Sequence, residues 1–224
     1  KWGVYKERGW GNKHLITYSE SHDEERSAYK IKTFGNSSGG YNTKNLATLV
    51  DRKILTNAFL FTIPGPKMTY MFEELAYDES IDDPCRICEK SILWSYYANT
   101  HRNRLYKYTA ALINMRNSYG VFKTDNFIYA LNGGSKRINL SVQDTNATVV
   151  GNFNVTAGDV YPNFQHTGTW YDYFTGDSVM VTNATAPMTY QPGEWHVYTD
   201  VKLDKASLIG VDEAKDVPSR VALY

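Results

Sequence analysis

The sequence predicts a chain of two parts, an α/β part with parallel strand and helix units followed by an all-β part that forms an antiparallel sandwich. Up to residues 117–125 apolar residues recur mainly at helical spacing, and beyond them short alternating segments are separated by Gly, Asn and Asp. At 224 residues the chain is long enough to bury a sizeable core. We expect an α/β domain over 1–122, a β-sandwich domain over 123–202 and a linker or tail over 203–224.

The first part begins with a strand-like segment at 14–18, which leads directly into the polar run 19–26. A loop of Gly, Ser and Asn at 35–40 then precedes a helix that begins near Lys44, with Asn42 or Thr43 placed to cap it. This helix is stopped by Pro64-Gly65-Pro66, because proline removes a hydrogen-bond donor and pushes the preceding residue out of the α region.

A second strand and a second helix follow. Residues 67–72 have the composition of a short buried strand, and that strand ends in the acidic pair Glu73-Glu74. The second helix is capped near Asn99 or Thr100 and places Leu105, Leu112 and Met115 on one face. Strands that alternate with helices favour parallel β/α units, so both acidic loops are expected at the same edge of a sheet.

The second part is predicted to be a series of short strands. Turn signals at Asn132-Gly133-Gly134, Gly176-Asp177 and Pro192-Gly193 separate them, as is typical of an antiparallel sandwich. The expected strands are 127–131, 137–142, 148–155, 169–174, 178–182 and 195–199.

Composition limits the function classes. Lys plus Arg equals Asp plus Glu at 24 each, so no overall field attracts nucleic acid or anionic lipid. There is no run of about 18 apolar residues, and we therefore expect no membrane span. The chain opens on Lys1-Trp2-Gly3-Val4, without an initiator Met or an apolar signal region, and we expect it to be a piece of a longer protein.

Two cysteines, Cys85 and Cys88, form a single Cys-x-x-Cys, which is too few ligands for a closed zinc site unless distant histidines contribute. A local disulfide or two free thiols is favoured over redox catalysis, because no strand-to-helix context surrounds the pair. Aromatic residues make up 14% of the chain. Their rings can stack on sugars, but core packing is the favoured interpretation for Trp170 and Trp195.

The polar run 19–26 is the candidate functional site. His22 stands next to Asp23, and Glu20, Glu24 and Glu25 surround the pair. Placed at the carboxyl end of a strand, such a group could handle a sugar, although a solvated loop with surface ion pairs has the same composition. Glu74 is expected to support loop structure more than to transfer protons.

Several motifs in order resemble the α-amylase superfamily, glycoside hydrolase family 13. Tyr18-Ser19-Glu20-Ser21-His22-Asp23 is similar to that family's seventh-strand motif, with Ser21 where asparagine is usual. The helix that ends in residues 60–68, with its Pro-Gly turn, and the following segment 70–75 look like the seventh helix and eighth strand, with Glu73 at a usual glycine position. Residues 90–94 and 105–116 are similar to the eighth-helix region, and the motifs 168–176 and 192–195 to the following β-domain.

The resemblance implies a fold and an activity. The fold is the C-terminal part of a (β/α)8 TIM barrel over 1–122, followed by an antiparallel Greek-key β-sandwich. The activity is retaining hydrolysis of α-glucans such as starch or maltooligosaccharides. Asp23 is then a catalytic residue that stabilises the transition state, and His22 and Glu20 bind substrate. The nucleophile and the acid/base are implied to lie on the missing N-terminal part of the barrel, so the piece alone is expected to be inactive.

Other implications stay open at this point. Hydrolysis and transfer use the same groups, so a glucan branching enzyme or another transglycosylase is an alternative, as is a non-catalytic carbohydrate-binding fragment. An interaction protein that merely reuses the fold is a third. No metal site or cofactor is evident, although calcium is common in the family and could belong to the full-length parent. The resemblance also implies a bacterial protein that is secreted or held at the cell surface.

Overall fold

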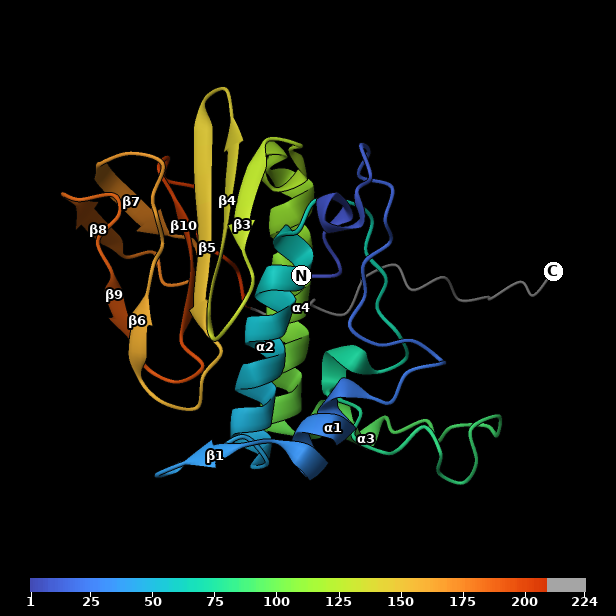
Figure 1. The fold of residues 1–224 in the computed structure, drawn as a ribbon. Helices are drawn as coiled ribbons and strands as arrows, with labels where there is room; N and C mark the ends of the chain where they lie inside the picture. Colours follow the sequence, from blue (N-terminus) through green and yellow to red (C-terminus); the bar gives the residue numbers. More distant parts are fainter. Residues whose placement is uncertain (209–224) are drawn as a thin grey trace.

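The computed structural model describes residues 1–208, which form an antiparallel β-sheet packed on one face against two long helices. Figure 1 shows the helices α2 (Leu46–Thr62) and α4 (Thr100–Ser118) side by side, with the sheet on one side of them and loop-rich N-terminal segments on the other. The mixture of helices and antiparallel sheet agrees with an α/β part followed by an all-β part.

Short elements surround the two long helices. They are the 3-10 helix η1 (Tyr5–Arg8), α1 (Ser27–Phe34), the small hairpin β1 (Ser37–Ser38) and β2 (Tyr41–Asn42), η2 (Glu73–Leu75), α3 (Ser95–Ala98) and η3 (Gly120–Lys123). Of these, α1 lies directly after the polar run and had no counterpart in the sequence-based expectation.

Helix α2 starts slightly later than expected. Its N-cap is Asn45, which makes no side-chain capping bond, and the helix begins at Leu46. Asn42 instead accepts a hydrogen bond from the Lys44 amide at 3.0 Å, and Thr43 donates to the carbonyl of Asn36 at 2.7 Å. The prediction that Asn42 or Thr43 caps the helix was therefore wrong, because Thr43 bonds across the base of the hairpin and Asn42 bonds the Lys44 amide before the helix begins. The helix ends at Thr62, as the Pro-Gly-Pro signal predicted.

Helix α4 begins where the sequence indicated. The side chain of Asn99 accepts hydrogen bonds from the amides of His101 at 3.1 Å and Arg102 at 3.2 Å. These bonds satisfy two of the amides that have no partner inside the first helical turn.

The two strands expected at 14–18 and 67–72 are reduced to one parallel bridge between Thr17 and Lys67. The Thr17 amide donates to the carbonyl of Pro66 at 3.0 Å, and the Met68 amide donates to the carbonyl of Thr17 at 3.2 Å. A longer ladder needs further backbone hydrogen bonds on either side of this bridge. The two segments form no other strand pair within residues 1–208. The expected parallel direction is present, but the described residues form no closed barrel.

All six strands expected in the second part are present. The six-stranded sheet has the order β3-β4-β5-β10-β7-β8, and every pair in it is antiparallel. A separate antiparallel pair, β6 and β9, was not expected from the sequence. The bounds are β3 (Phe127–Ala130), β4 (Ser135–Val142), β5 (Thr145–Asn152), β6 (Gly158–Val160), β7 (Gly168–Asp172), β8 (Ser178–Val181), β9 (Met188–Tyr190) and β10 (Trp195–Thr199).

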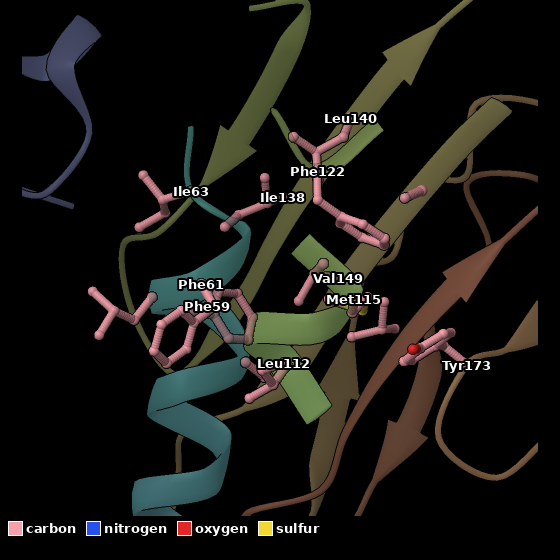
Figure 2. Close-up of a cluster of buried hydrophobic side chains, with 14 of the residues drawn as sticks. Phe59, Phe61, Ile63, Leu112, Met115, Phe122, Ile138, Leu140, Val149 and Tyr173 are labelled. Carbon is pink, nitrogen blue, oxygen red and sulfur yellow. The ribbon is translucent and has the colours of Figure 1, made fainter. Parts of the chain in front are cut away.

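The sheet has two buried faces because side chains alternate along each strand. Val149 and Val197 face the helices, whereas their neighbours Val150 and Tyr198 belong to a second cluster with Trp170. Figure 2 shows the first cluster, in which side chains of α2 and α4 meet those of β4 and β5. Its labelled members are Phe59, Phe61, Ile63, Leu112, Met115, Phe122, Ile138, Leu140, Val149 and Tyr173.

The core therefore crosses the boundary expected at 122/123, and the domain division itself stays a prediction. At the other expected boundary, Ala206 is buried and its amide donates to the carbonyl of Tyr173 at 3.1 Å. Leu203 and Leu208 pack against the same core. The remainder of the expected tail, 209–224, lies outside the described residues.

Candidate functional site

The parallel bridge places the two acidic loops at one end of the molecule. The chain runs in the same direction through Thr17 and Lys67, so the run 19–26 and the turn 70–76 both follow the bridge on the same side. They also touch, since the hydroxyl of Ser19 donates to Oε1 of Glu73. The two acidic loops are therefore in contact, as expected, but the segments before them form a single bridge and not the edge of a sheet.

His22 and Asp23 lie at the surface of this end. Their side chains are 75% and 77% exposed, and Nε2 of His22 lies 3.4 Å from Oδ2 of Asp23. The Asp23 backbone is held at both polar groups, because its amide donates to Oγ of Ser21 at 3.2 Å and its carbonyl accepts from Arg86 at 2.7 Å. The pair is accessible to a ligand while its backbone is fixed.

An aromatic ring flanks the pair. The centroid of the Tyr70 ring lies 6.4 Å from that of His22, and the rings are tilted by 58°. The guanidinium of Arg26 also rests on Tyr70, 4.4 Å from its centroid, which is a cation–π distance. Tyr70 thus connects the exposed histidine to a buried arginine.

Glu20 lies below the surface, with 1% exposure. Its Oε2 accepts hydrogen bonds from the amide of Ser27 at 2.8 Å and from the Ser27 hydroxyl at 2.5 Å. Oε1 lies 3.8 Å from Nη1 of Arg26, and Oε2 lies 3.6 Å from Nζ of Lys53. The structure does not bring Glu20 to the same surface as His22 and Asp23; its carboxylate faces protein groups.

Two further charged residues, Lys53 and Glu73, are equally buried at 1% exposure. Nζ of Lys53 lies 3.2 Å from Oε1 of Glu73 and donates to the hydroxyl of Ser27 at 2.5 Å. Glu73 also accepts from the amide of Tyr70 at 3.3 Å. Sequence reasoning missed Lys53, although a lysine between Val50 and Ile54 on the apolar face of α2 is a signal for a buried partner.

The remaining carboxylates of the loops support structure. Ser21 donates to Glu24. Glu25 accepts from the hydroxyl of Ser80 and the amide of Ile81, at 2.7 and 2.8 Å. Burial tends to raise the pKa of Glu25, but these hydrogen bonds outweigh it and lower the pKa below its ordinary value. Burial raises the pKa of Glu74, and the negative charge of Glu73 adds to this effect.

The Cys-x-x-Cys motif lies beside the candidate site as a disulfide between Cys85 and Cys88. Arg86, inside the disulfide loop, donates to the Asp23 carbonyl and pairs with Asp82 at 3.2 Å. The disulfide alternative for these cysteines is therefore the one observed, and it closes a loop that contacts the exposed pair.

Neither Trp170 nor Trp195 belongs to this site. Trp170 is fully buried against Phe164, with ring centroids 4.8 Å apart. Trp195 packs against Phe174 and Tyr108 at the contact between the sheet and α4, with centroid distances of 4.9 and 6.0 Å. The core-packing interpretation of both residues is confirmed.

A cavity with a volume of about 660 Å³ lies at the opposite end of the bridge. Its lining includes Lys13, Lys67, Arg116 and Lys123, and each of these side chains donates to backbone carbonyls. Arg116 donates to four of them, and Lys67 shares one of these, the carbonyl of Gly65 at 2.7 Å. Burial, with the nearby charge of Arg116, lowers the pKa of Lys67 to about 7. We infer that Arg116 and Lys67 stabilise the packing of the segments whose carbonyls they bind.

Within residues 1–208 there is no helix long and apolar enough to cross a membrane. The same residues contain no group of three or more His, Cys, Asp or Glu side chains that could hold a metal ion.

Comparison with known proteins shows the fold. No protein-family model matches the chain, and no curated protein sequence matches it. Its structure is similar to that of an α-amylase from Geobacillus thermoleovorans in complex with acarbose, with a TM-score of 0.65 and 16% identity over 87% of this chain and 41% of that one. The resemblance to the α-amylase family is thus confirmed for the fold.

Other solved structures of the same kind are similar. A cyclomaltodextrinase has a TM-score of 0.62 and 16% identity, with coverage of 84% of this chain and 30% of that one. The trehalose-6-phosphate hydrolase of Bacillus licheniformis has a TM-score of 0.60 and 12% identity, with coverage of 88% and 45%. The chain therefore spans between about a third and a half of the length of these α-amylase-type enzymes.

Proposed function

We propose that this chain supplies the His22–Asp23 part of the substrate site of an α-glucan-active glycoside hydrolase. The observation that carries the proposal is the exposed pair at the end of two parallel segments, next to the ring of Tyr70, in a fold shared with α-amylase-type enzymes. An accessible imidazole, carboxylate and aromatic ring are suited to bind sugar hydroxyls and the apolar face of a sugar ring.

The chemistry assigns separate roles to the two residues. His22 hydrogen-bonds hydroxyls of the sugar at the cleavage subsite. Asp23 binds the ring hydroxyls and interacts more strongly as the ring flattens and positive charge develops, which lowers the barrier. Glu20 is better suited to hold the loop than to bind substrate, because its oxygens face Ser27, Arg26 and Lys53.

Bond cleavage with retention needs a nucleophile and an acid/base about 5 Å apart across the scissile bond. In this proposal both belong to the remainder of a (β/α)8 barrel, to which residues 1–122 contribute the last strands and helices, and a Greek-key sandwich follows. The chain alone is then inactive on starch. Transfer to a sugar hydroxyl instead of water uses the same covalent intermediate, so a transglycosylase is the second candidate.

The setting of the parent protein is also proposed. The Cys85–Cys88 disulfide supports secretion or display at the surface of a bacterial cell, where disulfides persist.

A titration of the isotope-labelled chain with acarbose, followed by NMR, tests the proposal. We expect saturable shifts at 18–24 and 70–73, which are lost in His22→Ala and in Asp23→Asn. The matched control is His166→Ala, since His166 is also an exposed histidine beside a carboxylate, 3.0 Å from Asp200 in the β-sandwich. Shifts that move to the sandwich, or that survive in both site variants, would contradict the proposal.

A further inference from the structure

Beneath the exposed pair lies a buried charge cluster of four residues, Glu20, Arg26, Lys53 and Glu73, each 1% exposed. Removing charges from water is costly, and the cost is offset only when each charge keeps partners in good geometry. Lys53 and Glu73 contact each other, and Glu20 accepts from Ser27. Oε1 of Glu20 and Nε and Nη1 of Arg26 have no hydrogen-bond partner among the described residues, and the Arg26 guanidinium instead packs on the rings of Tyr70 and Tyr77. These contacts constrain the segments that carry the four residues.

Those segments are separate in the sequence. Lys53 lies in the middle of α2, Glu73 opens the turn η2, and Glu20 and Arg26 lie at either end of the loop that carries His22 and Asp23. Lys53 is the shared partner, because its ammonium contacts Glu73 at 3.2 Å, Glu20 at 3.6 Å and the Ser27 hydroxyl at 2.5 Å.

The cluster fixes both ends of the loop. On the incoming side, Ser19 donates to Glu73. On the outgoing side, the Ser27 amide donates to Glu20 at 2.8 Å. Both ends of the segment between Glu20 and Ser27 are therefore anchored to the same buried charge cluster.

A second contact runs from the cluster to the histidine. Arg26 packs on the rings of Tyr70 and Tyr77, and the Tyr70 ring lies 6.4 Å from that of His22. The amide of Tyr70 donates to Glu73 at 3.3 Å, so the ring's backbone is held by the same carboxylate that contacts Lys53. Displacing Glu73 would move both the loop end and the ring that faces His22.

We propose that Lys53 and Glu73 are positioning residues that hold His22, Asp23 and Tyr70 in the arrangement that binds sugar. The statement that this arrangement binds sugar rests on the proposed function. The statement that Lys53 and Glu73 control the conformation of the loop is independent of that function, and it can be measured without a ligand.

The test uses Lys53→Met, Glu73→Gln and the double variant of the full chain. Lys53→Met leaves Glu73 without its cation. Glu73→Gln keeps the volume of the side chain and part of its hydrogen bonding, so it still tests the proposal if Lys53→Met does not fold. The control is Arg104→Met, which removes a half-exposed ion pair with Asp51 between α4 and α2, away from the loop.

Without ligand, we expect amide exchange at Ser27 and Tyr70 to accelerate about tenfold or more in Lys53→Met while the amides of α4 keep their protection. The imidazole resonances of His22 should shift in Lys53→Met and Glu73→Gln and stay unchanged in Arg104→Met. With acarbose, the affinity should fall about tenfold in each site variant, with effects that are not additive in the double variant.

Unchanged exchange and unchanged His22 resonances in the two single variants would overturn the proposal. So would full acarbose affinity in a variant that has lost protection at Ser27 and Tyr70. If the unaltered chain fails to bind acarbose, the proposed function fails, and the exchange and imidazole data still decide whether the pair sets the loop.

Discussion

Asn57 of α2 donates from Nδ2 to Oγ1 of Thr109 in α4 across 3.1 Å, in an interface where both side chains are buried. The bond lies between helices that together form one layer of the molecule (Figure 1). A buried amide depends on such a partner, because desolvation without a hydrogen bond is unfavourable.

Thr109→Val should therefore destabilise the chain. The valine keeps the shape of threonine but removes the acceptor, and the stranded amide of Asn57 should lower the free energy of unfolding by about 1–3 kcal/mol. Thr56→Val in α2 is the control, because its half-buried hydroxyl bonds the Arg52 carbonyl of the same helix and no other helix. Urea unfolding monitored by circular dichroism compares them; equal midpoints would show that the Asn57 bond contributes nothing.

The pH dependence of stability should include a contribution from His196. Burial lowers its pKa, but hydrogen bonds to Asp172 through Nδ1 and to Glu194 through Nε2 outweigh burial and raise the pKa above its ordinary value. The unfolded chain has the ordinary pKa near 6.5, so the stabilisation is fully present below that pH and is lost as pH rises through the folded pKa.

His196→Gln should accordingly lose more stability at about pH 6 than at about pH 8.5, as measured by thermal unfolding across that range. His101→Gln, at an exposed position on α4, is the control. A loss for His196→Gln that is constant with pH would contradict the assigned pKa direction.

Lys67 should show the opposite dependence. Its pKa is about 7 in the folded chain and about 10.4 when unfolded, so the unfolded state binds more protons between those values and stability rises with pH there. The other titratable side chains that line its cavity, Lys13, His14, Arg116 and Lys123, are all basic.

Lys67→Met should therefore stabilise the chain most, relative to the unaltered protein, near about pH 6, and this advantage should shrink toward about pH 10. NMR titration of the Lys67 side chain gives the pKa directly, and Lys44→Met serves as an exposed control. A side-chain pKa for Lys67 at the ordinary lysine value would refute the prediction.

Gly151 of β5 lies where the sheet packs closely against helix α2. A Cβ atom there would lie 2.7 Å from Cδ1 of Leu55 and 3.2 Å from Phe59. Gly151→Ala should overpack this contact and cost about 1–3 kcal/mol of unfolding free energy. At Gly158 in β6 an added Cβ meets no atom within 4 Å, so Gly158→Ala should be close to neutral. Chemical denaturation of both variants checks the difference.

How far the sequence predicts this molecule differs between its two parts. The strands of the sheet follow from alternation and turn residues, which are local signals, whereas β6 and β9, each of three residues, are too short to show a period. The segments 14–18 and 67–72 have strand composition but form one bridge, because pairing depends on neighbours that local pattern does not contain.

The candidate site also has a part that local sequence predicts and a part that it does not. The run around His22 and Asp23 is visible in the sequence because its residues are adjacent. The burial of Glu20 and the pairing of Lys53 with Glu73 depend on how α2 packs against two loops, and residues 20 positions apart carry no local sign of that contact. The charged residue within the apolar face of α2 was the one readable indication.

The hydrophobic cluster of Figure 2 has a consequence for how such chains can be divided or exchanged. Its members include residues of α2 and α4 on one side and of β3, β4, β5 and β10 on the other. Cutting the chain between residues 122 and 123 would leave an uncovered apolar wall on each product. Recombination between related genes should therefore yield folded products when the segments that encode the helices and the sheet are exchanged together.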